Sequence, residues 1–182
     1  SNIRIFVSHR IDIDSETVDT PVYFPVRCGA VYDEEGNSEI QGDDTGDNIS
    51  KLRMSFCEFT VQYWAWKNVD ADYYGLCHYR RYLSFSDKRY KNTVFNMVRE
   101  LKLTPHEKKK YHLDDTKKIE KTVKQYDMII PVVAKASEMS YNRAEVKTLR
   151  EMWESYNGVY FEQGIIDKMF SLIKEYSPEY YN

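Results

Sequence analysis

Cysteine, glycine and proline are scarce in this chain of 182 residues, which contains 3 Cys, 7 Gly and 5 Pro. The three cysteines, Cys28, Cys57 and Cys77, are odd in number and form no C-x-x-C pair. This argues against both a disulfide framework and a structural zinc site. We therefore expect all three to be small buried side chains of a protein in a reducing, cytoplasmic compartment.

Long apolar runs and an excess of one charge are also missing. The longest apolar runs, such as Met128–Ala134, are too short to cross a bilayer, and the chain opens directly on a strand-like pattern, so we expect neither a membrane span nor a signal peptide. The formal net charge is −3, from 26 basic and 29 acidic side chains, which offers no global field for nucleic acid or an anionic membrane. We expect a cytoplasmic protein, with peripheral association at the inner face of the membrane left open.

What is present is a globular composition, with 42% hydrophobic and 15% aromatic residues. The length suits a single domain over residues 1–182. Strands are predicted over Ile3–His9, Val22–Arg27, Tyr73–Tyr79 and Gln125–Pro131, with a long acidic loop over Tyr32–Ser50. Helices are predicted over Ser50–Lys67, Val94–Leu101, Thr116–Lys124, Arg143–Tyr156 and Phe161–Tyr176. This alternation predicts an α/β fold with a Rossmann-like, mostly parallel sheet and a helical C-terminal region.

The helix predicted over Ser50–Lys67 has the strongest pattern in the chain. Ser50 is a plausible N-cap, and apolar side chains recur at three- and four-residue spacing. That face comprises Leu52, Phe56, Phe59, Tyr63 and Trp66, and the stripe is widened by Cys57, Thr60 and Trp64. We expect it to pack deeply against the sheet.

The densest cluster of functional side chains follows the strand at Tyr73–Tyr79. His78, Arg80 and Arg81 stand at its carboxyl end, where ligands bind in open α/β sheets. Two adjacent guanidinium groups suit phosphate oxygens in bidentate geometry. The alternative is that both arginines pair with acidic loop residues such as Asp43 or Asp44. A nuclease with a tyrosyl intermediate is a poor match, because the chain has no basic surplus.

The acidic motifs are weaker evidence for a functional site than the cluster after Tyr73–Tyr79. Asp70-Ala71-Asp72 is a D-x-D that could hold Mg²⁺ or Mn²⁺, but it precedes a strand instead of following one, so we favour a solvated turn. The loop Asp43–Asn48 leads into a helix N-terminus and could orient an anion or a sugar hydroxyl, or could merely complement the helix dipole. Glu58 reads as an isolated exposed charge. A metal-dependent phosphoesterase using Asp43, Asp44 and Asp70 is a third interpretation.

Three segments together resemble one family: Gly46–Ser50, the aromatic helix Cys57–Asn68, and the strand that reads G-L-C-H-Y-R-R-Y from Gly75 to Tyr82. They look like the bacterial capsular and exopolysaccharide biosynthesis glycosyltransferase family. The resemblance implies a glycosyltransferase A-type fold and a nucleotide-diphosphate sugar as donor. In that class a D-x-D-bound metal usually neutralises the leaving diphosphate. Here we expect Arg80 and Arg81 to do part of that work, so no cofactor is required, although a divalent cation (Mn or Mg) stays open.

The resemblance also implies a set of site residues and partners. We expect Asp44, His78, Arg80 and Arg81 to be catalytic, with Asp44 or His78 as the candidate general base. Donor binding is expected from Ser8, His9, Gly29 and Asn48. The acceptor would be a glycan or a lipid-linked saccharide, with no nucleic acid as partner. Because family members usually continue past Asn182, a truncated chain is one expectation, and a non-catalytic module that binds nucleotide sugar or carbohydrate is the alternative.

Overall fold

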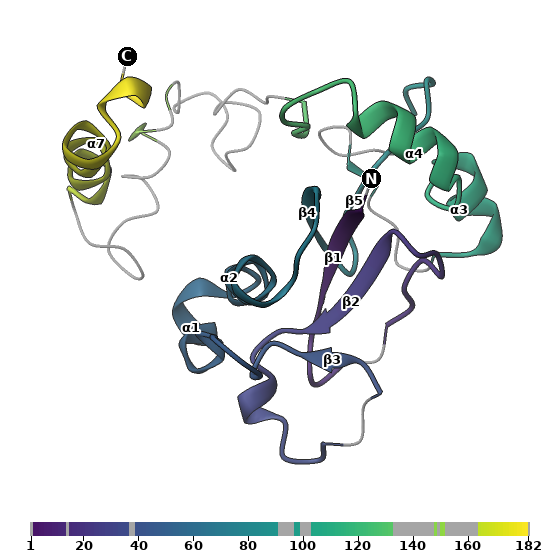
Figure 1. Ribbon diagram of the computed structural model, residues 1–182, viewed down its shortest axis with the longest axis horizontal. Coiled ribbons are helices and arrows are strands. Elements are labelled where there is room, and N and C mark those ends of the chain that lie inside the picture. Colours follow the sequence, from purple (N-terminus) through teal and green to yellow (C-terminus); the bar gives the residue numbers. More distant parts are fainter. Residues whose placement is uncertain are drawn as a thin grey trace. The chain divides into compact units, whose positions relative to one another are not determined.

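A computed structural model describes residues 2–13, 15–36, 39–90, 97–98, 103–132, 148, 150–151 and 164–181 (Figure 1). The chain falls into two compact units, Ser1–Val132 and Val133–Asn182. Each unit is described below by itself. The single domain predicted over residues 1–182 stays a prediction.

The first unit is built on a four-stranded sheet in the order β3-β2-β1-β4. Its strands are β1 (Ile3–His9), β2 (Tyr23–Arg27), β3 (Gln41–Gly42) and β4 (Tyr73–His78). All three pairings are parallel, and central β1 aligns Phe6 with Phe24 on one side and with Leu76 on the other. The parallel α/β architecture is thus confirmed. Short β3, inside the loop expected at Tyr32–Ser50, was not predicted. Because the strands are parallel, their carboxyl ends meet at one edge.

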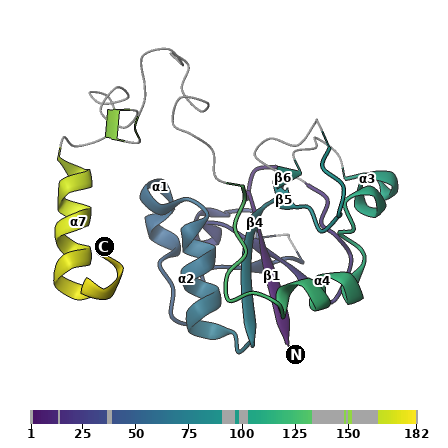
Figure 2. The same cartoon turned by 90° about the horizontal axis from the view of Figure 1, so that it is seen from above.

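Helices cover both faces of this sheet (Figures 1 and 2). Helix α2 (Phe59–Asn68) lies on one face, where Val61, Trp64 and Ala65 pack with Phe6 and Val26. On the other face, residues around α3 (Pro105–Lys110) and α4 (Thr116–Val123) complete a second cluster. That cluster includes Ile3, Val7, Tyr23, Tyr82, Leu103, Tyr111, Leu113 and Ile119. Packing on both faces explains why β1 is buried or half-buried along its whole length.

The long helix predicted over Ser50–Lys67 is in fact three elements. They are η2 (Ser50–Leu52), α1 (Arg53–Phe56) and α2, with a break at Cys57, whose φ is +47°. Ser50 is not an N-cap, because its hydroxyl donates instead to the buried Asp43 carboxylate at 2.5 Å. Cys57 is exposed, contrary to the expectation that all three cysteines are buried.

The centre of the predicted core face was also wrong, although Thr60 and Trp64, expected to widen that face, are buried. Leu52, Phe59 and Trp66 are 47%, 58% and 63% exposed. Helix α2 instead buries the side on which Trp64 contacts the sheet and the hydroxyl of Thr60 reaches Asp43. The need to satisfy a buried carboxylate, which no periodicity reveals, selects the face that turns inward.

Beyond β4, the strands β5 (Tyr82–Leu83) and β6 (Met97–Val98) form an antiparallel pair. The helix predicted over Val94–Leu101 is therefore wrong at its two described residues. Helix α3 was not predicted; Pro105 opens it and the Thr104 side chain caps it. Helix α4 is confirmed, with Asp115 accepting from the backbone N–H of Lys118 at 3.0 Å.

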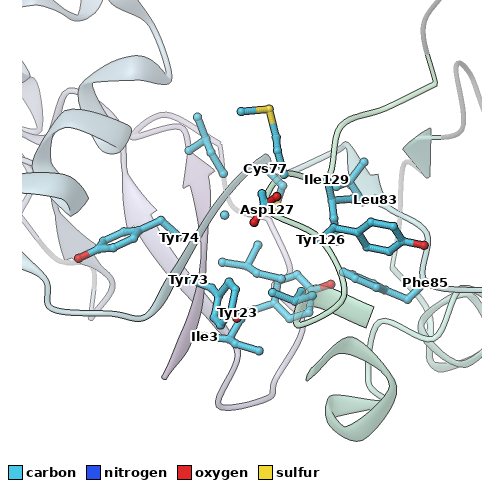
Figure 3. Close-up of a pocket in the computed structure, with 15 residues that line it drawn as sticks. Ile3, Tyr23, Tyr73, Tyr74, Cys77, Leu83, Phe85, Tyr126, Asp127 and Ile129 are labelled. Carbon is cyan, nitrogen blue, oxygen red and sulfur yellow. The ribbon is translucent and has the colours of Figure 1, made fainter. Parts of the chain in front are cut away.

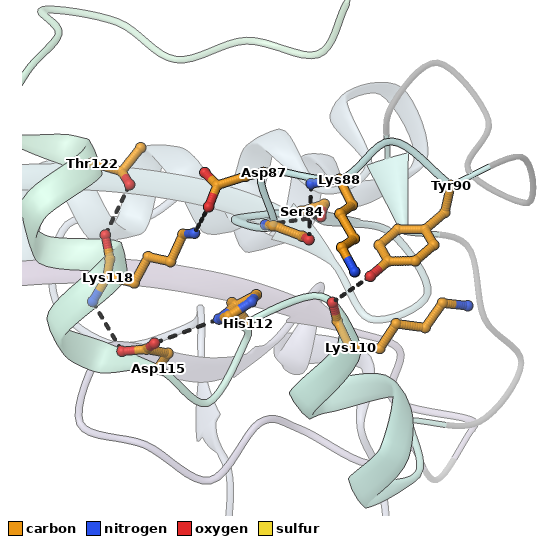
Figure 4. Close-up of polar contacts among 10 residues, drawn as sticks. Ser84, Asp87, Lys88, Tyr90, Lys110, His112, Asp115, Lys118 and Thr122 are labelled. Carbon is orange, nitrogen blue, oxygen red and sulfur yellow. Dashed lines mark hydrogen bonds and ion pairs between the residues drawn. The ribbon is translucent and has the colours of Figure 1, made fainter.

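Polar contacts tie α4 to the chain that follows β5. The Lys118 ammonium pairs with Asp87, and His112 contacts Asp115 at 3.4 Å (Figure 4). After α4, the strand predicted over Gln125–Pro131 does not form. Tyr126, Met128 and Ile130 are 57%, 77% and 59% exposed, so this apolar segment has not entered the sheet.

The second unit contains α7 (Ile165–Tyr176) and η3 (Pro178–Tyr180). Helix α7 confirms most of the helix predicted over Phe161–Tyr176. The helix predicted over Arg143–Tyr156 falls almost entirely outside the described residues. Among the helices that the structure describes, none combines the length and the apolar character needed to span a bilayer.

Candidate functional site at the carboxyl edge of the sheet

The carboxyl ends of the strands bring separate segments together at one edge. Strand β1 ends at His9 and is followed by Arg10, and β4 ends at His78 and is followed by Tyr79 and two arginines. Backbone hydrogen bonds continue past the strand ends: Tyr79 N–H donates to the Ser8 carbonyl at 3.1 Å. The residues after β1 and β4 are therefore held side by side.

His78 ends β4, the outermost strand at one end of this edge, and is half-buried. Its Nδ1 accepts the backbone N–H of Arg80 at 3.2 Å, and its carbonyl accepts the N–H of Arg81 at 2.8 Å. Burial is the main cause that lowers the pKa of His78; Arg81, Arg80 and Arg10 lower it further, whereas Glu58 raises it. The ring is therefore neutral near pH 7 and carries its proton on Nε2. The ring thus offers an N–H donor at Nε2.

The charges of three arginines act on His78, and we call Arg10, Arg80 and Arg81 the arginine cluster. Arg80 and Arg81 are exposed, and the Arg80 guanidinium lies 5.0 Å from the centre of the Tyr79 ring. The Arg10 side chain makes a two-pronged contact with Asp12, with Nε 2.8 Å from Oδ1. That hydrogen bond raises the pKa of Arg10 and lowers the pKa of Asp12. Forked, permanently charged donors of this kind suit phosphate oxygens.

Asp43 plays a structural role. Its carboxylate is fully buried and accepts the backbone N–H groups of Gly29 and Ala30, both at 2.9 Å. It also accepts the hydroxyls of Ser50 and Thr60, both at 2.5 Å. These four contacts join the ends of β2 and β3 to η2 and α2. The alternative pairing of Arg80 or Arg81 with Asp43 or Asp44 is not seen in the part of the chain that the structure describes.

Gly29, expected to bind the donor, sits in the turn after β2 with φ +70°. A Cβ atom at this position would lie 2.1 Å from Cδ of Arg53. The position therefore requires glycine for both its backbone conformation and the close approach of Arg53.

The other predicted site residues divide between buried supports and the β3 end. Ser8 and His9 are 4% and 2% exposed, and the two ring nitrogens of His9 contact the hydroxyls of Ser15 and Thr17 at 2.6 Å. Asn48 donates to the carbonyls of Asp44 and Gly46, both at 3.0 Å, and so shapes the loop. Asp44 is exposed after β3.

The structure thus brings His78, Arg80 and Arg81 together but places Asp44 and Asn48 at the far end of the same edge. The strands β2 and β1 stand between them. Three strand spacings separate β3 from β4, which is roughly 14 Å. Asp44 and His78 therefore follow strands that are not neighbours in the sheet.

A D-x-D metal site does not fit this edge. Asp70 and Asp72 precede β4, at the amino edge of the sheet, where Asp72 accepts the backbone N–H of Asn2 at 2.7 Å. The solvated turn expected there is confirmed. Within the described residues, no group of three or more His, Cys, Asp or Glu side chains is placed to share a metal ion. Asp43, Asp44 and Asp70 are not brought together, so the phosphoesterase interpretation is wrong.

The sequence pattern did not single out Arg10 or Asp12, and Glu58 was interpreted as an exposed charge. Arg10 follows the first strand at the carboxyl edge, so the rule that singled out His78 could have found it. The spacing of the sequence did not relate Glu58 to His78, because the two residues lie on different elements. Its charge acts on His78, and it is half-buried.

A cavity of about 300 Å³ lies elsewhere, between β4 and the segment after α4 (Figure 3). Tyr23, Tyr73, Phe85 and Asp127 are among its 15 lining residues, which include no Lys, Arg or His. None of the eight predicted site residues lines it. With no cation, its lining is unsuited to a diphosphate, so we place the candidate site at the arginine cluster.

Comparisons with known proteins agree with this fold. A solved structure of WbbM in its apo form, described as a bifunctional glycosyltransferase, matches with a TM-score of 0.80 and 28% sequence identity. The match covers 99% of this chain and 30% of the WbbM chain. No curated protein matches. A family model described as "Domain of unknown function (DUF4422)" matches residues 4–182, so the chain belongs to that family.

Proposed function

We propose that this chain transfers a sugar from a nucleotide-diphosphate donor to a saccharide acceptor, and that the arginine cluster holds the donor diphosphate. The observation that carries the proposal is that the charges of Arg10, Arg80 and Arg81 all act on His78 at the carboxyl edge of a parallel sheet. Ligands bind at this edge in open α/β folds. The likeness to WbbM, a bifunctional glycosyltransferase, supports the transfer of a sugar in particular.

Sugar transfer requires that the negative charge on the leaving diphosphate be stabilised. As the acceptor oxygen bonds to the anomeric carbon, the bond from that carbon to the diphosphate oxygen breaks and its electron pair stays on the diphosphate. Two exposed guanidinium groups, those of Arg80 and Arg81, and the Nε2–H of His78 are the donors that this edge offers to the leaving group. Donors that are already oriented lower the barrier, and the loss of one typically costs a factor of about 10²–10³ in rate.

We place the general base on a neighbour of His78, and not on Asp44 or His78, the two candidates expected from sequence. His78 accepts a hydrogen bond at Nδ1 and offers only a donor at Nε2, and Asp44 lies three strands away. Glu58 is the carboxylate whose charge reaches His78. We propose Glu58 as the group that takes the proton of the acceptor hydroxyl.

The acceptor proposed from the family resemblance is a growing surface polysaccharide or a lipid-linked saccharide. Since the chain spans only 30% of the length of WbbM, the acceptor and the linkage are proposals drawn from that resemblance. The resemblance also supports a cytoplasmic location.

The test is a thermal-shift titration with a panel of nucleoside diphosphates and their sugar conjugates, each in Mn²⁺ and in chelator. A ligand at about 100 times its Kd stabilises by roughly 2.7 kcal/mol, which a melting curve resolves. We expect one diphosphate to stabilise the protein in chelator, and Arg80→Ala and Arg81→Ala to lose that shift. The exposed Arg89, outside the cluster, gives the matched control Arg89→Ala. Stabilisation that requires Mn²⁺, or that survives both substitutions, contradicts the proposal. Binding without sugar transfer or donor hydrolysis would favour the non-catalytic module.

A further inference from the structure

Five large apolar side chains stand out from the surface along η2, α1 and α2. Leu52, Met54, Phe56, Phe59 and Trp66 are 47%, 86%, 45%, 58% and 63% exposed, and we call them the apolar ridge. Single exposed apolar residues are ordinary, but a contiguous group marks an interaction surface. On α2 the ridge is continuous, because Tyr63 lies between Phe59 and Trp66 and its ring centre is 5.8 Å from that of Trp66.

Cations border this ridge. The Lys67 ammonium lies 3.7 Å from the centre of the Trp66 ring, and Lys51 is exposed beside Leu52. The third cation between residues 50 and 68, Arg53, packs against Gly29 instead, and its charge acts on Asp12. Glu58 is the acid of this stretch. The charge of Glu58 acts on His78, in the company of the arginine cluster. One further carboxylate, Asp47, is close; it accepts the Tyr63 hydroxyl at 3.1 Å.

We propose that the apolar ridge docks onto the surface of an anionic lipid bilayer. Trp, Phe, Met and Leu side chains bordered by Lys and Arg are the composition of helices that lie in the membrane interface. The aromatic rings would enter the boundary between headgroups and acyl chains, while Lys67, stacked on Trp66, would reach the lipid phosphates. Charge complementarity favours this partner, because Lys51 and Lys67 border the apolar side chains of the ridge. The proposal is independent of sugar transfer.

The experiment is flotation of the protein with vesicles of phosphatidylcholine, with and without about 30% phosphatidylglycerol. We expect the protein to float with the anionic vesicles, to bind neutral vesicles far more weakly and to be released by high salt. Phe59→Ser combined with Trp66→Ser should weaken binding at least about tenfold. Lys67→Glu should weaken it at least about fivefold, which corresponds to the loss of one interfacial cation.

The matched control carries two serine substitutions at exposed apolar residues outside the ridge, Met128→Ser and Val132→Ser, which are 77% and 48% exposed in the native chain. It should bind as the native protein does. Three results would overturn the proposal. The first is no flotation with anionic vesicles, and the second is an equal loss in ridge and control variants. The third is a ridge variant that changes oligomeric state or melts well below the native protein, because the ridge would then be covered by protein.

Discussion

The buried carboxylate of Asp43 should be the most sensitive single position for the architecture of the site. It accepts two backbone N–H groups and two hydroxyls at 2.5–2.9 Å, with no exposure to solvent. In Asp43→Ala both N–H groups lose their acceptor. At about 2 kcal/mol for each buried donor without a partner, the loss is roughly 4 kcal/mol. This is a large part of the roughly 5–15 kcal/mol that stabilises a domain.

The substitution Asp43→Asn removes the charge of this side chain and keeps its shape. Its amide NH₂ could face Thr60, whose hydroxyl already lies 3.0 Å from the Cys57 carbonyl and could redirect its proton there. The same NH₂ would also face the N–H of Gly29, so one donor loses its acceptor at a cost of about 2 kcal/mol. Ser50→Ala should cost only about 1 kcal/mol. Urea unfolding followed by the fluorescence of buried Trp64, whose indole bonds to Thr45, would measure this order. Equal midpoints for the native protein and Asp43→Ala would refute the structural role.

Three further predictions concern other positions. Gly29→Ala should destabilise by roughly 1–2 kcal/mol from its left-handed backbone alone, with more from the displaced Arg53, and the same urea titration measures it. Because burial lowers the pKa of His78, its neutral form stabilises the fold above the unfolded pKa of about 6.5, and this contribution is lost as the pH falls below that value. His78→Gln should therefore flatten the dependence of unfolding free energy on pH just below about pH 6.5; an unchanged slope would contradict this. Asp70→Asn should leave donor binding and its response to chelator unchanged in the thermal-shift assay, whereas a loss of binding would restore the D-x-D as a site.

The sequence predicted the parts of the fold that follow from local pattern. Strand β1 has the predicted bounds, and α4 begins where Asp115 caps it. The prediction failed where a distant group decided the outcome. The hydroxyls of Ser50 and Thr60 turn toward Asp43, and with the break at Cys57 this changes the face of the aromatic helix that is buried. The apolar segment Gln125–Pro131 has strand character, but strand formation also requires a partner edge, which a pattern within one segment does not contain.

The candidate site was likewise predicted only where local sequence was enough. His78, Arg80 and Arg81 are neighbours in sequence, so a rule about strand ends was enough to gather them. Asp44 and Asn48 were grouped with them, although the strand order that separates β3 from β4 is invisible in the spacing. His9 has the chemistry of a ligand-binding residue, but Ser15 and Thr17 contact both of its ring nitrogens.

The central claim, that arginines hold the donor diphosphate, is tested most directly by calorimetric titration in chelator. Nucleoside diphosphates and the matching monophosphates would be titrated into the native protein and into Arg80→Ala with Arg81→Ala. The account predicts that the native protein prefers the diphosphate, and that the double variant loses about tenfold or more of this affinity with little change for the monophosphate, since a hydrogen bond to a charged group is worth about 1.5–3 kcal/mol. Equal diphosphate affinity in the two proteins, or binding only after a divalent cation is added, would contradict it.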